Sequence, residues 1–321
     1  MAIPDLGGVA VLVTGGAGFI GSHLVDAVFE RGARVRVLDN LATGKRDNLA
    51  GLTGRFEFME GDIRDITTCH TACAGVRYVF HQAALGSVPR SMKDPATSLA
   101  VNVSGTANIF TAARDAGVAR VVYASSSSVY GDSQALPRCE GGEGRPLSPY
   151  ALSKHVDEEL ADTFARCFAM ELIGLRYFNV YGPRQDPHGA YAAVIPRFFA
   201  AYRRGEAPVI YGDGGQSRDF TAVTDVVEAN LLAAGAPSSA CGRAYNVGAG
   251  GRTTLNELVQ IIRAAAGGVL PPCYEAMRPG DVRDSEADTR AAREMLGFSA
   301  ATPLTAGIER ARNYYMALPV A

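Results

Sequence analysis

The 321-residue sequence has no long run of basic residues, and its charges nearly balance. Its 31 lysines and arginines stand against 33 aspartates and glutamates, so the formal net charge is −2 at pH 7. Proteins that bind nucleic acid usually carry a basic patch or stripe. The balance of charge therefore argues against a nucleic-acid partner.

A long apolar run is also missing. The stretch MAIPDLGGVAVLVTGG has no basic residue before its short apolar run, which leads straight into glycines. A membrane-spanning helix needs about 20 apolar residues, and a secretory signal needs a basic region before its apolar region. We therefore expect no signal peptide, no membrane partner and a cytoplasmic location.

Cysteine and histidine are scarce and scattered. The six cysteines are spread along the chain, which is typical of reduced thiols in a cytosol. Cys69 and Cys73 in CHTAC have the spacing of half a metal site, but no second ligand cluster accompanies them. Because structural metal sites usually combine four such ligands, we expect no metal.

What the first 180 residues do contain is an alternation of strand-like and helix-like segments. Short apolar or alternating runs predict strands at 9–16, 34–40, 55–62, 77–84, 120–131 and 171–180. Helical spacing is found at 19–32, at 98–117 and from Tyr150 to about Met170. Strands that alternate with helices indicate right-handed βαβ units, and hence an α/β fold with a parallel sheet.

The pattern changes after Asn179. A loop and then a helix are predicted at 181–199, a hairpin at 207–223, and a return to the large sheet at 223–250. Another helix is predicted at 253–267, with Thr253 or Thr254 as its cap, before a tail that mixes loop and helix.

These segments predict two lobes with a shared interface. The first lobe would contain 1–179 plus about 221–249, and the smaller lobe about 180–220 plus 250–321. Ligands of open parallel sheets bind beyond the carboxyl ends of the strands. We therefore expect the chemistry in a cleft between the lobes.

A glycine-rich loop follows the first predicted strand. In VTGGAGFIGSH, Gly15, Gly18 and Gly21 give the spacing G-x-x-G-x-x-G. Glycines permit a tight turn and let backbone N–H groups approach a pyrophosphate at a helix terminus. Asp39 follows about 20 residues later at a strand end, where its carboxylate would accept ribose hydroxyls and repel a 2′-phosphate. This favours NAD over NADP, the alternative being a structural turn with an unrelated aspartate.

Two further patterns are ambiguous on their own. GDI at 61–63 follows a strand and would place Asp62 and Ile63 beside an adenine, although a plain turn with a buried isoleucine fits nearly as well. SPYALSKH places Tyr150 one helical turn before Lys154, on the same face. Since a fixed ammonium lowers the pKa of a phenol, the pair could serve as a base. The alternative is a solvated helix face with an incidental tyrosine.

The ordered motifs TGGAGFIG, HQAA, SSSSVYG, SPYALSK and RYFNVYGPRQ resemble those of the extended short-chain dehydrogenase/reductases. More narrowly, the chain is similar over essentially its whole length to the NAD-dependent sugar-nucleotide 4-epimerases. The resemblance implies a Rossmann-type doubly wound parallel sheet that carries NAD and a smaller C-terminal α/β lobe that binds a UDP-sugar. It also implies a homodimer packed through the helices at 99–116 and 150–169.

The resemblance implies roles for individual residues. Tyr150 would be the catalytic acid/base, Lys154 its partner and a ligand of the nicotinamide ribose, and Ser126 a hydrogen-bonding partner of the sugar hydroxyl. Arg218 and Arg278 would clamp the diphosphate. Further cofactor contacts are implied for Gly15, Gly18, Phe19, Ile20, Gly21, Asp39, Asn40, Asp62, Ile63, Ala83 and Tyr177. Further substrate contacts are implied for Ser87, Arg90, Ser127, Asn179, Val194 and Ser285.

The serine loop bears on the reaction that the resemblance implies. In this family the tyrosine removes a proton from a sugar hydroxyl while hydride passes to NAD⁺, which gives a keto-sugar. Dehydratases carry an acid/base pair at this loop and decarboxylases a glutamate, whereas here Ser127 and Ser128 occupy those positions. Elimination then lacks its catalysts, and epimerisation at carbon 4 remains. The alternatives are a decarboxylase, reductase or other epimerase of the same fold, or a non-catalytic NAD-binding regulator.

Two stretches bear on the sugar. ALGSVPRS and RQDPHGAYAAVIPRF look closest to the branch of epimerases that acts on N-acetylhexosamine nucleotides. In this family the seventh residue after the second diphosphate arginine borders the pocket at carbon 2, and counting from Arg278 reaches Ser285. A serine there leaves room for an N-acetyl group, unless it is simply a loop serine that faces solvent. We expect UDP-GlcNAc and UDP-GalNAc as substrates, with UDP-Glc and UDP-Gal as further candidates.

Overall fold

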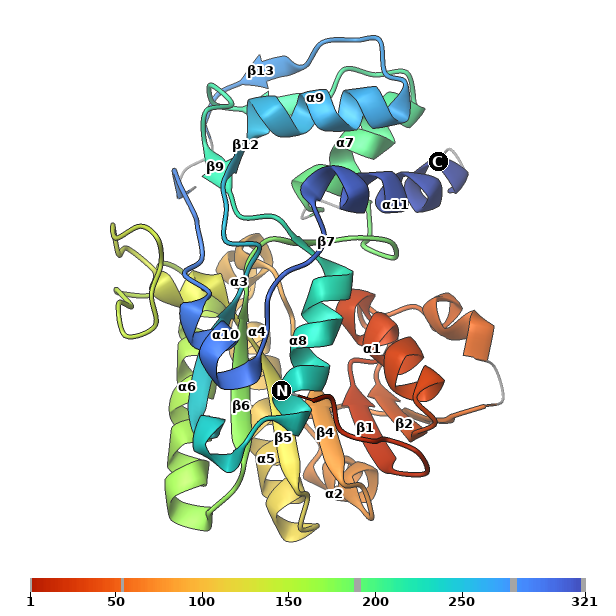
Figure 1. The fold of residues 1–321 in the computed structure, drawn as a ribbon, viewed down its shortest axis with the longest axis vertical. Helices are drawn as coiled ribbons and strands as arrows, with labels where there is room; N and C mark the ends of the chain where they lie inside the picture. Colours follow the sequence, from red (N-terminus) through yellow and green to blue (C-terminus); the bar gives the residue numbers. More distant parts are fainter. Residues whose placement is uncertain (1, 53–54, 188–191, 278–281, 319–321) are drawn as a thin grey trace.

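The computed structural model describes residues 2–52, 55–187, 192–277 and 282–318 (Figure 1). Within these residues, seven strands form one parallel sheet in the order β11-β6-β5-β4-β1-β2-β3. The strands are β1 (Ala10–Thr14), β2 (Arg34–Asp39), β3 (Glu57–Glu60), β4 (Tyr78–His81), β5 (Arg120–Ser126), β6 (Leu172–Tyr177) and β11 (Arg243–Val247). The predicted α/β fold with a doubly wound parallel sheet is confirmed.

Helices cover both faces of this sheet, which explains why its strands are so apolar. Because successive residues of a strand point to opposite faces, Val11 and Val13 pack into one hydrophobic cluster and Leu12 into another. The first cluster is covered by α1 (Phe19–Glu30), α8 (Val223–Gly235) and α10 (Arg290–Leu296). The second is covered by α2 (Ile66–Cys73), α5 (Gly105–Asp115) and α6 (Pro149–Phe168).

The helix expected at 98–117 is divided into unlike pieces. It begins as α4 (Pro95–Leu99), continues as a π-helical segment over Ala100–Ser104, and becomes regular again as α5. A π turn contains one more residue than an α turn, and such turns often occur at functional sites. A short helix, α3 (Val88–Lys93), precedes α4, and Ser87 is its N-cap.

The helices α7 (Val194–Arg203), α9 (Leu255–Ala266) and α11 (Leu304–Ala317) pack together beyond one edge of the large sheet (Figure 1). Their apolar faces form a hydrophobic cluster of their own, which includes Phe199, Leu258, Ile262 and Ile308. Of the small strands near these helices, β7 (Val180–Tyr181) lies between this group and the sheet, whereas β13 (Cys273–Glu275) lies on the far side of α9 (Figure 1). No helix in the described part of the chain is long and apolar enough to cross a membrane.

The prediction of a hairpin at 207–223 is wrong. The structure forms β8 (Val209–Tyr211) and β9 (Ser217–Arg218) there, but they do not pair with each other. Gly212 and Gly214, both with positive φ, turn the chain between them. The strands then pair with distant segments: β8 with β13 (Cys273–Glu275) and β9 with β12 (Thr253–Thr254). A third small pair joins β7 (Val180–Tyr181) to β10 (Thr221–Ala222).

The start of α9 agrees with the sequence. Thr254 is the N-cap: its hydroxyl accepts the Glu257 N–H at 3.1 Å, while the Glu257 carboxylate accepts the Thr254 N–H at 2.8 Å. This reciprocal arrangement is a capping box, which satisfies two backbone donors at the helix start. The prediction that Thr253 or Thr254 caps this helix is confirmed for Thr254.

The loop between β1 and α1 depends on close contacts that only glycine allows. Gly15 has a φ of +67°, and a Cβ added there would lie 2.7 Å from the backbone nitrogen of Ala83. A Cβ added to Gly21 would lie 2.1 Å from the carbonyl oxygen of Gly15. The first turns of α1 therefore pack directly on the loop, and the loop packs on the end of β4.

We expect Gly21→Ala to lower the free energy of unfolding by about 1–3 kcal/mol, because its methyl group would overlap a backbone oxygen that cannot move freely. Urea unfolding of the purified chain measures this change. Gly51→Ala is the matched control, because a Cβ at Gly51 would meet no atom within 4 Å. If the two substitutions had equal effects, the close contact of Gly21 would not be a constraint on this loop.

Candidate active site

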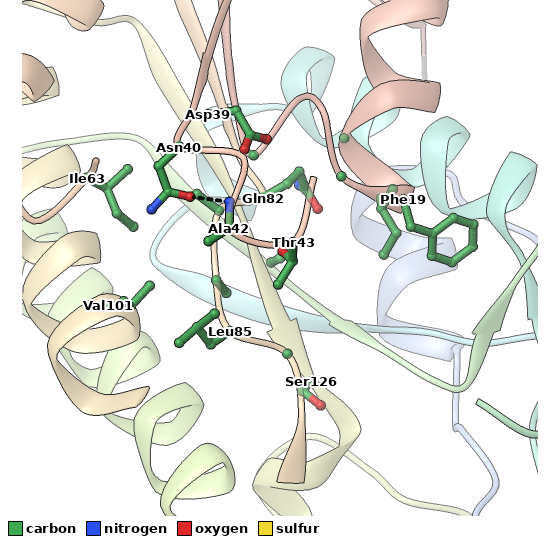
Figure 2. A pocket seen from close by; sticks show the side chains of 18 of the residues that line it. Phe19, Asp39, Asn40, Ala42, Thr43, Ile63, Gln82, Leu85, Val101 and Ser126 are labelled. Carbon is green, nitrogen blue, oxygen red and sulfur yellow. Dashed lines mark hydrogen bonds between the residues drawn. The ribbon is translucent and has the colours of Figure 1, made fainter. Parts of the chain in front are cut away.

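A cavity of about 490 Å³ lies at the carboxyl ends of the strands, and we name it the sheet-edge cavity. Figure 2 shows residues of several loops facing into it, among them Asp39, Ile63, Leu85 and Ser126. The site residues predicted from the sequence that line it are Gly15, Gly18, Phe19, Ile20, Gly21, Asp39, Asn40, Ile63, Ala83, Ser126, Tyr150, Lys154 and Tyr177. The structure thus brings together residues from the loops that follow β1 and β4, from the ends of β2, β5 and β6, and from α1 and α6.

The first turn of α1 borders this cavity. Gly18 is its N-cap, with no side-chain hydrogen bond to the first turn and no acidic residue within that turn. The first N–H groups of a helix have no partner inside the helix, and together with the helix dipole they favour an anion. The start of α1 therefore suits a phosphate group in the cavity.

Asp39 ends β2 and is 7% exposed. Its two carboxylate oxygens accept the N–H groups of Ala17 at 2.9 Å and of Leu41 at 2.8 Å. Burial raises the pKa of Asp39, and the two backbone hydrogen bonds oppose that shift. Each oxygen retains a further lone pair, so the carboxylate can still accept a ligand's hydroxyl groups.

Asp62 lies outside the lining of the sheet-edge cavity, whereas its neighbours Ile63 and Arg64 are part of it. The Asp62 carboxylate accepts hydrogen bonds from Asn40 at 2.8 Å and from Arg64 at 2.7 Å. The hydrogen bonds from Arg64 hold the pKa of Asp62 well below its usual range. Asp62 therefore orders two residues that face the cavity, and its predicted contact with a cofactor stays a prediction.

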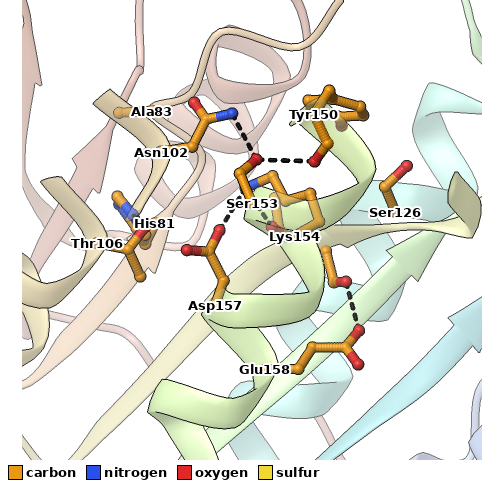
Figure 3. A network of polar contacts seen from close by, with 12 residues as sticks. His81, Ala83, Asn102, Thr106, Ser126, Tyr150, Ser153, Lys154, Asp157 and Glu158 are labelled. Atoms are coloured by element: carbon orange, nitrogen blue, oxygen red, sulfur yellow. Dashed lines mark hydrogen bonds and ion pairs between the residues drawn. The ribbon is translucent and has the colours of Figure 1, made fainter. Parts of the chain in front are cut away.

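Tyr150 and Lys154 lie one turn apart near the start of α6, as their spacing predicts (Figure 3). Ser148 caps this helix by accepting the Ala151 N–H at 3.1 Å, and the Tyr150 N–H donates to the hydroxyl of Ser91 at 3.1 Å. Both side chains line the sheet-edge cavity. The interpretation of this helix as a solvated face with an incidental tyrosine is wrong, because Lys154 is 3% exposed.

The Lys154 ammonium is held by two acceptors. Its Nζ donates to the carbonyl oxygen of Ala124 at 3.0 Å and to Asp157 Oδ2 at 3.0 Å. Burial on its own would lower the pKa of Lys154, but the charge of Asp157 and the nearby Tyr150 more than compensate, so that the pKa is raised. Lys154 is therefore an ammonium at neutral pH.

The four consecutive serines belong to regular structure. Ser125 and Ser126 end β5, and Ser127 and Ser128 begin the 3-10 helix η3 (Ser127–Tyr130). The hydroxyl oxygen of Ser126 accepts hydrogen bonds from the backbone N–H and the hydroxyl of Ser128, at 3.2 and 2.8 Å. The Ser126 hydroxyl can therefore donate its own hydrogen to a ligand in the cavity.

A second cavity, of about 230 Å³, adjoins the first, and we name it the lobe cavity. Val180 and Gln185 line both cavities. The predicted substrate residues Asn179, Val194 and Arg218 line the lobe cavity. The lobe cavity therefore gathers residues from the end of β6, the start of α7 and β9.

Asn179 and Arg218 are fixed by the backbone around them. Asn179 has a φ of +25°, a left-handed conformation that few residues other than glycine adopt. Such strain is often found at functional sites. The guanidinium of Arg218 donates to the carbonyl oxygens of Ser217 at 2.8 Å and Arg283 at 3.1 Å.

Several predicted substrate residues line neither cavity: Ser87, Arg90, Ser127 and Ser285. Ser87 caps α3, where its hydroxyl accepts the Arg90 N–H at 3.2 Å. The Ser285 N–H donates to the carbonyl oxygen of Ser217 at 3.2 Å, which places its backbone beside the residue before Arg218. Arg278 lies outside the described residues.

Sequence reasoning missed residues at both cavities. In the sheet-edge cavity these include Thr43, Gln82, Leu85, Thr97, Val101 and Gln185; in the lobe cavity they include Arg197, Tyr211 and Gln216. Gln82 and Leu85 follow β4, so the rule that sites gather at strand ends points to their loop. In the lobe cavity, Arg197 lies on α7, Tyr211 ends β8 and Gln216 precedes β9, and nothing in the local sequence identifies them.

Asn102 was also missed, although it anchors the residues behind Tyr150. It is fully buried in the π-helical segment. Its side-chain oxygen accepts the Leu85 N–H at 2.8 Å, and its amide nitrogen donates to the Ser153 hydroxyl at 3.0 Å. That hydroxyl in turn donates to the Tyr150 carbonyl oxygen at 2.7 Å (Figure 3). The π turn thus ties α6 to the loop after β4.

Cys69 and Cys73 are buried in α2, where they contribute to the hydrophobic cluster of that face. Burial raises the pKa of each thiol to about 12. Among the residues that the structure describes, no group of three or more histidine, cysteine, aspartate and glutamate side chains could hold a metal ion. These two cysteines therefore pack as apolar side chains.

Known proteins share this arrangement. Residues 11–248 match the model of the NAD dependent epimerase/dehydratase family. UDP-glucose 4-epimerase of Mycolicibacterium smegmatis is 41% identical over 308 residues, which cover 95% of this chain and 97% of the relative. UDP-N-acetyl-alpha-D-glucosaminuronate decarboxylase of Bacillus cytotoxicus is 37% identical over 261 residues, which cover 78% of each chain.

Solved structures agree with the sequence relatives. A UDP-N-acetylglucosamine 4-epimerase of Methanobrevibacter ruminantium, in complex with UDP-N-acetylmuramic acid, matches with a TM-score of 0.92 and 36% identity, covering 97% of this chain and 99% of that one. The UDP-glucose 4-epimerase of Thermus thermophilus in complex with NAD matches with a TM-score of 0.86 and 36% identity, covering 96% and 99%. The chain is therefore an enzyme of the NAD dependent epimerase/dehydratase family.

Proposed function

We propose that this enzyme inverts carbon 4 of UDP-hexoses and uses NAD as a bound cofactor. UDP-GlcNAc and UDP-GalNAc are the proposed substrates, with UDP-Glc and UDP-Gal as further candidates. The observation that carries the proposal is the grouping of Tyr150, Lys154 and Ser126 on one wall of the sheet-edge cavity, beside a second cavity for the rest of the substrate. The similarity to named UDP-sugar 4-epimerases supports it.

The residues around the sheet-edge cavity fit NAD. The uncapped first turn of α1 suits a pyrophosphate, and the buried carboxylate of Asp39 suits the hydroxyls of an adenosine ribose. Lys154 would bind the nicotinamide ribose. When bound, NAD would supply the acceptor for the hydride of carbon 4 and the donor that restores it.

Within this proposal Tyr150 moves the proton and two neighbours assist it. Tyr150 accepts the proton of the carbon-4 hydroxyl as the carbon–hydrogen bond breaks, and returns it to the same oxygen after the 4-keto sugar has turned its other face. The Lys154 ammonium stabilises the phenolate electrostatically. Ser126 donates a hydrogen bond to the reacting oxygen, since its own oxygen is already engaged by Ser128.

The same wall argues for epimerisation rather than loss of a neighbouring group. Ser127 and Ser128 stand where a dehydratase or decarboxylase of this family carries carboxylates, and Ser128 is bound to Ser126. Glu158, a carboxylate nearby, binds Arg176 through both oxygens at 2.9 and 2.7 Å. Because one relative is a decarboxylase, decarboxylation is the competing function for this enzyme.

The lobe cavity would hold the UDP portion. We propose that Arg218 and Arg278 bind the diphosphate, with Asn179 and Val194 beside it, and that Ser87, Arg90 and Ser127 approach the sugar. Guanidinium groups suit phosphate because they offer several donors in a fixed geometry. We also propose two lobes, one of 1–179 plus about 221–249 and one of about 180–220 plus 250–321. The site would lie in the cleft between them.

A homodimer through α6 and the helical stretch at 99–116 is part of the proposal. Leu152 and Phe168, near the two ends of α6, are 43% and 46% exposed. A second copy of the chain would cover them. Sedimentation of the purified enzyme measures this association.

Proton NMR of a substrate panel, without added cofactor, tests the function. We expect UDP-GlcNAc and UDP-GalNAc to interconvert, while UDP-glucuronate and its N-acetylated form release no carbon dioxide. We expect activity without added cofactor, because NAD would stay bound to the enzyme through turnover. Loss of carbon dioxide, or a need for a second redox substrate, would contradict the proposal.

Tyr150→Phe should lower the turnover number by roughly 10²–10⁴, because the ring remains but the proton carrier is lost. The thermal midpoint and the content of bound NAD should stay close to those of the wild type. Tyr274→Phe is the control: its hydroxyl is exposed and donates to Asn256 at 2.9 Å, far from this mechanism. Activity near that of the wild type in Tyr150→Phe would remove Tyr150 from the mechanism.

Asp39→Asn should weaken NAD binding and reduce the preference for NAD over NADP by about tenfold or more, because a neutral amide does not repel a 2′-phosphate. Calorimetric titration of cofactor-depleted protein with each nucleotide gives the two dissociation constants. Asp47→Asn, at an exposed position in a neighbouring 3-10 helix, is the control. An unchanged preference in Asp39→Asn would show that Asp39 does not contact the ribose.

Ser285→Tyr should lower activity on UDP-GlcNAc and UDP-GalNAc by roughly 10–200-fold and largely spare UDP-Glc and UDP-Gal, because only the acetylated sugars need the space that the ring fills. The kcat/KM values for all four sugars measure this. Ser239→Tyr, at an exposed position, controls for the added ring. Equal losses on both pairs, or no loss on either, would show that Ser285 does not select the substrate.

A further inference from the structure

Asp157 lies one turn after Lys154 on α6, beneath the wall of the sheet-edge cavity (Figure 3). Its side chain is 1% exposed, and its Oδ2 lies 3.0 Å from the Lys154 Nζ. Its other oxygen, Oδ1, has no hydrogen-bond partner among the described residues. An ion pair buried this deeply gains little stability, because both charges lose their hydration. The pair therefore calls for an explanation other than stability.

Among the described residues that face Asp157, Lys154 is the cationic one. His81 of β4 is fully buried, and its ring nitrogens contact the hydroxyls of Thr14 at 2.7 Å and Thr106 at 3.0 Å. Burial, followed by the charge of Lys154, lowers the pKa of His81 to about 3, so the ring is neutral at physiological pH.

The remaining neighbours of Asp157 add no positive charge. Thr106 of α5 and Tyr123 of β5 are uncharged near neutral pH, since burial raises the pKa of Tyr123 well above its usual value. Glu158, the next residue on α6, is engaged by Arg176 at 2.7 Å. The negative charge of Asp157 is therefore directed at Lys154.

We propose that Asp157 is a positioning residue that keeps the Lys154 amine charged and aims it at the sheet-edge cavity. The proposal rests on the function proposed above, because it gives Lys154 the role of partner to Tyr150. Asp157 itself does not line the cavity, so it acts through Lys154.

The hydrogen bonds of the Lys154 ammonium explain how it is oriented toward the cavity. An ammonium has three N–H groups. The carbonyl oxygen of Ala124 and the carboxylate of Asp157 accept two of them, each at 3.0 Å, and the third remains for a ligand in the cavity. Without the carboxylate, burial would favour the neutral amine of Lys154.

The arrangement also carries a sensitivity to acid. Burial raises the pKa of Asp157 to about 6, against the charge of Lys154, which lowers it. As the pH falls through that value, Asp157 becomes neutral and Lys154 loses its counter-charge. The pair is complete only above this range.

The test compares Asp157→Asn with Asp162→Asn. Asp162 lies on the same helix but forms an exposed ion pair with Arg166. Asp162→Asn therefore makes the same change of carboxylate to amide at a position away from the site. In the pH profile of kcat on the substrate that turns over, the alkaline limb of Asp157→Asn should move down by about 1–3 pH units, since Lys154 loses its proton more easily. Asp162→Asn should keep the wild-type profile, and Asp157→Glu should restore the limb toward it.

A second measurement does not depend on activity. Urea unfolding should show Asp157→Asn less stable than the wild type near pH 7, and the difference should narrow toward about pH 10. The sign follows from linkage: a buried lysine with a lowered pKa binds fewer protons in the folded state than in the unfolded state, so stability rises with pH. The wild type lacks this rise, because the pKa of Lys154 is raised.

The outcomes separate the two proposals. A uniform loss of kcat with an unshifted pH profile, together with a stability difference that is constant with pH, would show a merely structural role and overturn the inference. If Asp157→Asn fails to fold, Asp157→Glu decides, because it keeps the charge but moves the carboxylate relative to the Lys154 Nζ. An alkaline limb that lies between its wild-type position and the position expected for Asp157→Asn supports the inference. An unshifted limb with a lowered kcat overturns it. If no sugar is epimerised by the wild type, the proposed function fails, whereas the unfolding curves still report the charge of Lys154.

Discussion

All the strands of the large sheet run in one direction, so their carboxyl ends meet at one edge, and the site depends on this constraint. Segments far apart in sequence end at this edge: Thr14 before the glycine loop, Asp39, His81, Ser126 and Tyr177. Parallel pairing in register places these strand ends beside one another. The helix that carries Tyr150 then has only to pack against β5 for its polar face to meet them.

Buried charges hold that helix in place on two sides. On one side Lys154, which is also paired with Asp157 of the same helix, donates to the carbonyl oxygen of Ala124 in β5. On the other, Arg176 of β6 binds Glu158 through two hydrogen bonds, at 2.9 and 2.7 Å, and also contacts Glu143. Bidentate pairs of this kind fix orientation as well as distance. Since buried ion pairs add little stability, we infer that the contacts of Lys154 with Ala124 and of Arg176 with Glu158 set the position of α6 against the strand ends.

The parts of the site that follow local rules could be predicted from the sequence, and those that follow distant packing could not. The glycine loop and Asp39 have a fixed spacing within one βαβ unit, so their chemistry shows in a short stretch. The hairpin expected at 207–223 failed because β8 and β9 find their partners more than thirty residues away, in segments with no strand-like pattern of their own. The π turn at Asn102 was likewise hidden, since its sequence has ordinary helical spacing and only the contact with Leu85 shows its purpose. For the same reason Asp157 reads as a surface residue of a helix until the structure shows it buried.

The proposed chemistry also explains why hydroxyl groups, rather than carboxylates, surround Tyr150. Inversion at carbon 4 returns every proton and hydride to the sugar, so one group that accepts and then donates a proton is sufficient. A second acid beside the keto-sugar would offer a proton to a neighbouring leaving group and open a path to elimination. Ser126 and Ser128 can orient the oxygen by hydrogen bonds without taking part in such a transfer, since their hydroxyls do not ionise near neutral pH. The buried carboxylates nearby, Asp157 and Glu158, are each paired with a cation, which keeps their charge from the sugar while it turns.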